Sequence, residues 1–355
     1  METCYVSARF PATSLRFRSV PRKFFLRRSP ASRLLPYFAC NLHSKSDKES
    51  SEASNRMFIL GMGFVGQFFA EQLKKDGWEV SGTCTTAMKK KNLEEMGYDA
   101  YIFDANDLEL KILNSLEYAT HLVISIPPVV GVGDLVLRHR DLLKRRVTNG
   151  KLRWLCYLSS TSVYGDCDGA WVNEDYPANP TRESAKARLD AEKGWLNLGH
   201  DLGLLVQVFR LGGIYGPGRS AVDTIIKQEP LSEGQRMRES RHYTSRVHVA
   251  DICQALNASI DMPSPRKIYN IVDDDPAPRG EVFAFAQGLV EKRWPSQFRE
   301  RPYPDRADLV IQKKITGGEK RVSNARLKKE LGVRLLHPSY KSGLQSIVDN
   351  MANPS

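Results

Sequence analysis

The chain has 355 residues, of which 41% are hydrophobic and 26% are charged, an ordinary balance for a globular protein. It holds no apolar run of about 18 residues, which argues against a membrane-spanning helix. Residues 1–45 hold nine of the 52 Lys and Arg and one of the 41 Asp and Glu, so 46–355 carry a net charge of only +3, which argues against a nucleic-acid partner.

Residues 1–50 are predicted to be a transit peptide followed by a disordered linker. The front segment is basic and rich in serine, and four prolines interrupt any long amphipathic helix. This composition favours a chloroplast protein, with a mitochondrial protein as the alternative. A disordered basic tail would have a similar composition. The polar stretch His43–Asn55 is typical of a linker.

The six cysteines suggest neither a disulfide framework nor a metal centre. They form no Cys-x-x-Cys pair and no metal-like spacing with histidines. We therefore expect free thiols and no metal.

The first regular elements predict a nucleotide-binding turn. Met57–Leu60 is a short apolar run suited to a buried strand, and Phe64–Lys75 has apolar residues at helical spacing. Between them, Gly61, Gly63 and Gly66 form a G-x-G-x-x-G motif. In a strand–turn–helix frame these glycines allow a tight turn, a close approach of the backbone to a pyrophosphate, and close helix packing. A glycine-rich turn without a ligand is the alternative.

The end of the next strand bears on the choice of cofactor. Residues 83–86, Thr-Cys-Thr-Thr, hold no carboxylate where NAD enzymes place one for the ribose. Three lysines, Lys89 to Lys91, follow. A missing acid and nearby cations favour NADP, with NAD as a possible cofactor because the lysines would also suit a solvated helix face.

Later strands also end on polar residues or prolines. Alternating strands and helices predict a doubly wound parallel sheet, in which strand ends meet at one edge and bind the ligand. The candidates at these ends are Asp104, Ser125, Pro127, Ser159 and Ser160.

Further motifs carry a family resemblance. Together with the glycine turn, "FRLGGIYGPGR" (209–219), "RVHVADI" (246–252) and "YNIVDDDP" (269–276) resemble the extended short-chain dehydrogenase/reductase superfamily, in its NAD-dependent epimerase/dehydratase group. The segment 320–344 is similar to YeeZ-like members. The resemblance covers about residues 56–348.

The resemblance implies a Rossmann-type α/β domain over 51–348 with a small C-terminal substrate-binding cap, built mainly from 218–247 and 276–320. It also implies a cofactor site. Its expected residues are Gly61, Gly63, Phe64, Val65, Gly66, Thr85, Asp104, Ser125, Pro127, Ser159, Arg188 and Leu211.

The same resemblance implies an atypical active site. Ser160 takes the place of the hydroxyl that holds substrate, but Ser184 and Arg188 stand where the family has its Tyr-x-x-x-Lys pair. A serine hydroxyl is too weak an acid to replace tyrosine, and an arginine stays charged, although it could hold the nicotinamide ribose. Tyr164 is a candidate acid, with packing under the cleft as its alternative role.

Three functions therefore stay open. The first is an NADP-dependent oxidoreductase or epimerase-like enzyme acting on a small polar substrate, with a homodimer as a possible assembly. The second is a catalytically reduced NADP-binding sensor or assembly protein. RNA binding is the third, and the near-neutral body argues against it. A nucleotide-sugar substrate is in doubt, because Thr244 stands where sugar-nucleotide enzymes of the family have a diphosphate-binding arginine, although Arg241 or Arg246 could approach the same anion.

Overall fold

The computed structural model describes residues 55–103, 110–227, 243–295 and 319–352. The chain divides at residue 50 into two units, and all of the described residues belong to the second unit, 51–355. The predicted transit peptide and linker, together with Asp104, lie outside the described residues.

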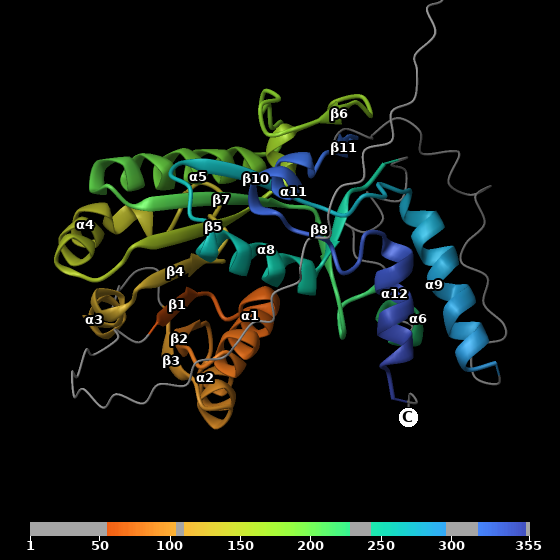
Figure 1. The fold of residues 1–355 in the computed structure, drawn as a ribbon, viewed down its shortest axis with the longest axis horizontal. Helices are drawn as coiled ribbons and strands as arrows, with labels where there is room; N and C mark the ends of the chain where they lie inside the picture. The colour runs from red at the N-terminus through yellow and green to blue at the C-terminus, as the bar shows by residue number, and fades with distance from the viewer. Residues whose placement is uncertain (1–54, 104–109, 228–242, 296–318, 353–355) are drawn as a thin grey trace, which may run out of the picture. The chain divides into compact units, whose positions relative to one another are not determined.

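Within the described residues, the centre of the fold is a sheet of seven parallel strands (Figure 1). Its order, β10-β7-β5-β4-β1-β2-β3, places the first strand inside the sheet, with the chain winding outward on both sides. The strands are β1 (Arg56–Leu60), β2 (Glu79–Cys84), β3 (Asp99–Ile102), β4 (His121–Ile124), β5 (Trp154–Ser160), β7 (Leu205–Leu211) and β10 (Lys267–Ile271). The predicted Rossmann-type doubly wound sheet is confirmed.

Helices cover both faces of this sheet (Figure 1). One hydrophobic cluster packs α1, α2, α8 and α11 on one face, and a second packs α3, α4 and α5 on the other. Their bounds are α1 (Phe64–Lys75), α2 (Ala87–Glu95), α3 (Leu110–Tyr118), α4 (Arg140–Asn149), α5 (Glu183–Leu202), α8 (Val249–Asp261) and α11 (Ala325–Leu331). Because both faces are covered, strands such as β1 and β5 are apolar along almost their whole length.

A separate small core lies beyond one end of the sheet. It joins α6 (Ala221–Lys227), α9 (Arg279–Arg293) and α12 (Tyr340–Asp349). The first two helices fall in the segments expected to form the cap, and α12 is an addition that the sequence prediction did not include. Residues 228–242 and 296–318 of those segments lie outside the described residues.

Shorter elements complete the described part of the fold. They form two parallel two-stranded ladders and two single turns of 3-10 helix. These elements are β6 (Trp171–Val172) with β11 (Arg321–Val322), β8 (Gly213–Tyr215) with β9 (Arg246–His248), η1 (Leu137–His139) and η2 (Thr161–Tyr164).

Candidate functional site

The glycine turn after β1 has three differently constrained positions. Gly61 has a φ of +100°, and its amide donates to the Thr83 hydroxyl at 2.9 Å. A Cβ on Gly66 would lie 2.6 Å from the Gly61 carbonyl oxygen, so α1 packs directly against the turn. A Cβ on Gly63 would have only the Gly61 oxygen within 4 Å, at 3.9 Å. Packing therefore requires Gly66, whereas the space beside Gly63 is open.

This open space faces the start of a helix. Gly63 is the N-cap of α1, and no side chain of the described residues caps that end. The amides of a helix's first turn and its macrodipole favour an anion. The end of β4 closes the other side, because Ser125 and Ile126 lie against Gly61. The strand order places this point between β1 and β4, where ligands of doubly wound sheets bind. The turn therefore fits a dinucleotide pyrophosphate.

The three lysines of α2, which follows β2, differ in whether an acidic side chain pairs with them. Thr86 caps the helix by accepting from the Lys89 amide, and Thr85 is exposed beside it. Lys90 and Lys91 approach Glu94 and Glu95 at 3.5 and 3.9 Å, one helical turn later. Lys89 is half-buried and forms no ion pair with the described residues. Of the three, Lys89 is the cation best placed for a phosphate next to Thr85.

The remaining cofactor candidates fall at different depths. Phe64 and Val65 are the first two residues of α1. Phe64 is half-buried, whereas Val65 is buried. Pro127 is exposed just beyond the end of β4. Leu211 is buried at the end of β7, directly opposite Ser160 on β5.

A cavity of about 770 Å³ opens beside the ends of β5 and β7. Ser160 and Ser184 both line it, so the structure brings together two hydroxyls that lie 24 positions apart in sequence. Arg188 and Tyr164, by contrast, are not among its lining residues in the described part of the chain. Of the cavity's charged residues, sequence reasoning had considered Arg246 as a possible anion contact. It missed the others, which are Arg182, Arg219, Asp223, Lys227, Arg279 and Lys320.

Arg188 lies one turn along α5 from Ser184. It is half-buried and sits near the hydroxyl of Tyr157 on β5. Burial raises the pKa of Tyr157, so this tyrosine stays protonated at neutral pH. Arg188 thus lies against β5, and its role in holding a nicotinamide ribose stays a prediction.

Ser159 belongs to a buried ion pair beneath the site. Its hydroxyl donates to Glu192 Oε1 at 2.5 Å, and Arg210 Nη2 donates to Glu192 Oε2 at 2.8 Å. Glu192 is 1% and Arg210 is 4% exposed. This network ties β5, β7 and α5 together, so the Ser159 hydroxyl has a structural partner inside the protein.

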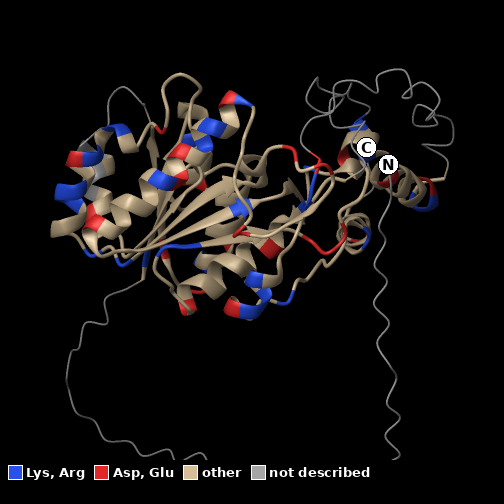
Figure 2. Cartoon of the chain, turned by 90° about the horizontal axis from the view of Figure 1, so that it is seen from above, with Lys and Arg blue, Asp and Glu red and all other residues tan. Residues whose placement is uncertain are grey.

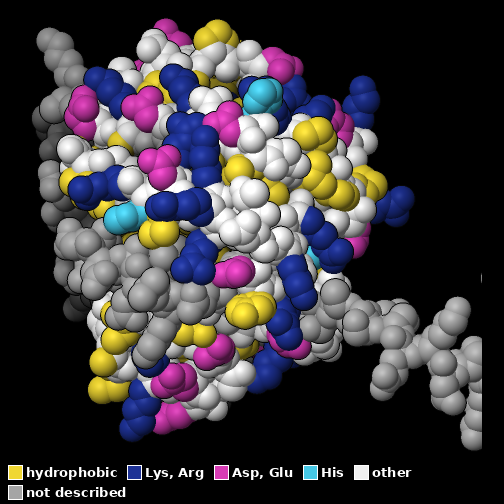
Figure 3. All heavy atoms as spheres, turned by 90° about the vertical axis from the view of Figure 1, so that its left-hand side faces the viewer, with side chains coloured by type: hydrophobic (Ala, Val, Ile, Leu, Met, Phe, Trp, Pro, Cys, Tyr) yellow, Lys and Arg dark blue, Asp and Glu magenta, His cyan; other side chains and the backbone are white. Residues whose placement is uncertain are grey.

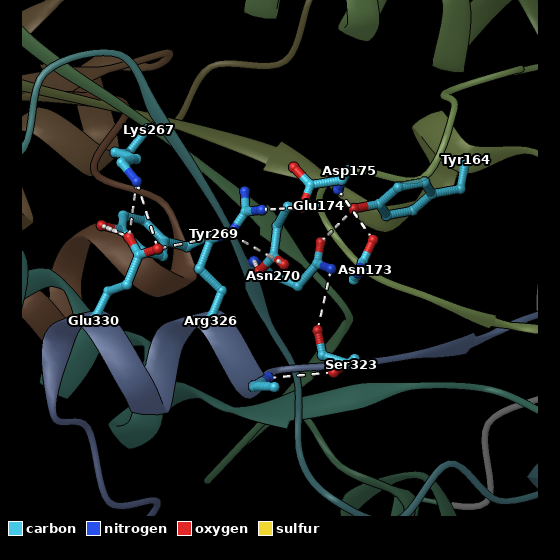
Figure 4. Close-up of polar contacts among 11 residues, drawn as sticks. Tyr164, Asn173, Glu174, Asp175, Lys267, Tyr269, Asn270, Ser323, Arg326 and Glu330 are labelled. Carbon is cyan, nitrogen blue, oxygen red and sulfur yellow. Dashed lines mark hydrogen bonds and ion pairs between the residues drawn. The ribbon is translucent and has the colours of Figure 1, made fainter.

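Tyr164 lies in a second polar network, drawn in Figure 4. Its hydroxyl donates to Asn270 Oδ1 at 2.8 Å, and the Asn270 backbone amide donates to Glu174 Oε1 at 2.8 Å. Arg326 of α11 approaches Glu174 at 3.7 Å, and Ser323 O accepts from the Asn270 side chain. The fully buried Tyr164 thus joins the C-terminal segment to the sheet, as its alternative role requires.

Three other tyrosines, Tyr215, Tyr243 and Tyr340, do line the cavity. The Tyr215 hydroxyl donates to the Ser339 carbonyl at 3.5 Å. Burial, reinforced by Asp273 and Asp251, raises the pKa of Tyr215, and burial likewise raises that of Tyr164. Both shifts are opposite to the one that proton transfer near neutral pH requires.

Neither a metal centre nor a membrane span is found in the described part of the chain. No group of three or more His, Cys, Asp or Glu side chains there could hold a metal ion, and no helix there is long and apolar enough to cross a bilayer. Cys84, Cys156, Cys167 and Cys253 are free and buried.

Surface charges of opposite sign are mixed on the described residues. Figure 2 shows Lys and Arg alternating with Asp and Glu over the helices. On the face shown in Figure 3, basic side chains lie among acidic and hydrophobic ones. This distribution gives little support to a nucleic-acid surface.

Comparisons with known proteins give one curated relative in two strains. Protein YeeZ of Escherichia coli K12 is 30% identical over 256 residues, which cover 69% of this chain and 86% of YeeZ. The O157:H7 protein matches equally. No protein-family model matches the chain.

Solved structures share the fold. A conserved protein of unknown function from Silicibacter pomeroyi is 32% identical, with a TM-score of 0.65, covering 84% of this chain and 99% of the other. A putative NAD-dependent epimerase/dehydratase from Methylobacillus flagellatus is 22% identical, with a TM-score of 0.59 and coverages of 84% and 98%. UDP-glucuronic acid 4-epimerase from Bacillus cereus is 16% identical, with a TM-score of 0.61 and coverages of 83% and 96%.

Proposed function

Because this chain belongs to the family of protein YeeZ, we propose that it is a YeeZ-like member of the extended short-chain dehydrogenase/reductase superfamily. It would bind a nicotinamide dinucleotide and act as an oxidoreductase or epimerase-like enzyme on a small polar substrate. The observation that carries the proposal is the open space beside Gly63 at the uncapped start of α1. Support comes from the Bacillus cereus epimerase, which has the same fold and was solved in complex with NAD.

We propose NADP in preference to NAD. Among the described residues, the end of β2 offers Thr85 and Lys89 but no carboxylate to bind the ribose hydroxyls of NAD. The 2′-phosphate of NADP would be held by a hydroxyl and a cation there.

Some residues of the protein would bind the cofactor, and others would orient the substrate. The first-turn amides of α1 would bind the pyrophosphate, and Arg188 would hold the nicotinamide ribose. Ser160 and Ser184 would orient a substrate hydroxyl or carbonyl in the cavity. When bound, the dinucleotide supplies a hydride donor or acceptor. The proton would come from ordered water or a non-standard acid, since the neighbouring tyrosines have raised pKa values.

A second candidate is a catalytically reduced NADP-binding sensor or assembly protein. It is favoured by the same tyrosine pKa values, together with Ser184 and Arg188 in place of the usual pair. A tyrosine with a raised pKa is a poor base near neutral pH, whereas cofactor binding requires none of these groups. The two candidates therefore differ in turnover and agree in binding.

The deciding experiment titrates the purified full-length chain with NADPH and NADH by calorimetry, then measures cofactor turnover with a panel of carbonyl compounds, sugars and sugar nucleotides. Binding with turnover supports the enzyme. Binding without turnover across the panel supports the sensor. If neither dinucleotide binds, both candidates are wrong.

A further inference from the structure

The cavity wall has two chemically different parts. One part comes from the end of β5, η2 and the start of α5, and it is rich in hydroxyls such as Ser160, Ser162 and Ser184. The other comes from β9, α6, α9 and α12, and it contains Arg246, Arg279 and Lys227. Asp223 is the one carboxylate among the described lining residues, against the six Lys and Arg named above. Such an excess of cations favours an anionic ligand.

Arg246 is the most enclosed of these cations. It is 8% exposed, and its Nη2 donates to the Ala277 carbonyl at 3.0 Å. Its guanidinium carbon lies 5.5 Å from the centre of the Tyr340 ring. Nη1 is buried and has no hydrogen-bond partner among the described residues. A buried donor without a partner is unfavourable, and more so if it is charged, so an acceptor supplied by a ligand would stabilise this position.

The start of α9 lies beside Arg246. The carbonyl that accepts from Arg246 belongs to Ala277, two residues before the helix begins at Arg279. Pro278 is the N-cap, and no side chain of the described residues caps this 15-residue helix. Arg279 and Val282 of its first turn line the cavity. The helix therefore directs its positive end and a second guanidinium toward the same wall.

The acids near Arg246 do not replace a ligand. Asp273 and Asp275 both raise the pKa of Arg246, Asp273 more strongly than Asp275. Neither forms an ion pair with Arg246 among the described residues. Asp273 is 3% exposed, and burial raises the pKa of its carboxyl well above the usual value, which favours the neutral form. Glu281, in the first turn of α9, accepts a hydrogen bond from the Tyr340 hydroxyl at 2.6 Å.

We propose that Arg246 and the start of α9 form an anion-binding end of the cavity, which takes the phosphate or carboxylate group of the substrate. The opposite, hydroxyl-rich part would then hold the substrate's neutral polar groups near Ser160 and Ser184. This inference deepens the proposed function, since it gives the substrate class of the same cavity. It rests on the cavity alone and requires no bound dinucleotide.

The test measures the binding of small anions to the full-length chain without cofactor. Inorganic phosphate, malonate and neutral glucose are titrated by calorimetry at an ionic strength held constant with chloride. Saturable binding of phosphate or malonate, with none of glucose, is expected. Comparison of the two anions shows which group the site prefers. Equal heats for all three probes, or no binding of either anion, would overturn the proposal.

Variants locate the site within the cavity. Arg279→Gln is expected to weaken anion binding at least about ten-fold, the loss of one charge-assisted hydrogen bond. Arg182→Gln makes the same charge change in the hydroxyl-rich part, and its affinity should stay within about two-fold of wild type. Arg246→Met should abolish binding, provided that its circular dichroism matches wild type. Unchanged affinity in Arg279→Gln, or an equal loss in Arg182→Gln, contradicts the assignment even if Arg246→Met does not fold.

The outcome is separable from that of the dinucleotide titration. Anion binding in a chain that binds neither NADPH nor NADH would refute the proposed function and leave this inference standing. Dinucleotide binding without anion binding would do the reverse.

Discussion

Gly63 and Gly66 lie three residues apart in one turn, yet the packing of the protein constrains only one of them. The Gly66 position touches the protein's own backbone, because a Cβ there would approach the Gly61 oxygen to 2.6 Å. The Gly63 position has space for a Cβ and a φ of −78°, which any residue can adopt. We therefore expect Gly63 to serve ligand binding, whereas the fold itself requires Gly66.

Substitutions at these two glycines should separate binding from stability. Gly63→Val is expected to abolish NADPH binding while changing the free energy of unfolding little. Gly66→Ala should lower that free energy by about 1–3 kcal/mol, as overpacking does. Urea denaturation and NADPH titration of both variants check this. A Gly63→Val protein that binds NADPH normally would show that the cofactor site is elsewhere.

Lys89 differs from its neighbours in having no acidic partner among the described residues. Lys89→Met is expected to weaken NADPH binding about ten-fold or more and to leave NADH binding almost unchanged, because only NADPH carries the 2′-phosphate. Lys91→Met, whose lysine faces Glu95, is the matched control. Calorimetry with both dinucleotides measures the ratio. An equal loss for NADPH and NADH would rule out a specific 2′-phosphate contact.

At the scale of elements, α5 contributes both to the cavity and to the buried core. Ser184 near its start lines the cavity, while Glu192 two turns later is buried against Arg210 of β7. The carboxylate accepts three hydrogen bonds from the guanidinium and one from Ser159. The helix is thereby fixed to the two strands whose ends border the cavity.

Removing this buried carboxylate should destabilise the fold. Glu192→Gln leaves Arg210 charged and without its partner, and is expected to lower the free energy of unfolding by about 3–5 kcal/mol. Asp190→Asn on the exposed face of α5, where the pair with Lys193 spans 3.9 Å, should cost less than about 0.5 kcal/mol. Chemical denaturation measures both. A similar small loss in the two variants would mean that the buried pair contributes little.

At the scale of the whole molecule, buried histidines predict a dependence of stability on pH. Burial, with Arg153, lowers the pKa of His121 to about 4, and burial, with His337, lowers that of His248 to about 4. The unfolded chain binds these protons near pH 6.5. Acidification from about 6.5 toward 4 therefore favours unfolding, by up to about 1.4 kcal/mol per pH unit for each histidine.

The His248→Asn variant tests this effect with little change in packing. His248 is the N-cap of α8, accepting from the Ala250 amide, and asparagine can also cap a helix. Stability measured between pH 4 and 7 should depend less on pH in this variant than in wild type. Parallel curves for the two proteins would assign the acid sensitivity to other groups, such as His121. Asp273 could not account for it, because its raised pKa makes acidification favour the folded state.

The compartment is a property of residues 1–50, which lie outside the described residues. We expect this segment, fused to a fluorescent reporter, to direct import into chloroplasts, because it is basic, serine-rich and almost free of acids. Fluorescence microscopy of the fusion and of a reporter without the segment checks the expectation. Mitochondrial import would support the alternative, and a cytosolic signal would contradict both.

The sequence by itself determined the sheet, the glycine turn and most element positions. These features depend on apolar periodicity and turn residues within a few positions of one another, so β1 and α1 were predicted almost to the residue. The same local pattern placed Ser184 and Arg188 on one helix, and the structure leaves their roles in binding or catalysis to experiment.

Only the tertiary structure decided which side chains share the cavity. Ser184 lines it, whereas Tyr164 of the "SSTSVYG" run packs against Asn270, because that pairing depends on a strand more than a hundred residues away. Arg246 and Arg279 have no common motif in the sequence. They meet because α9 begins beside β9, and long-range packing of this kind leaves no pattern among neighbouring residues.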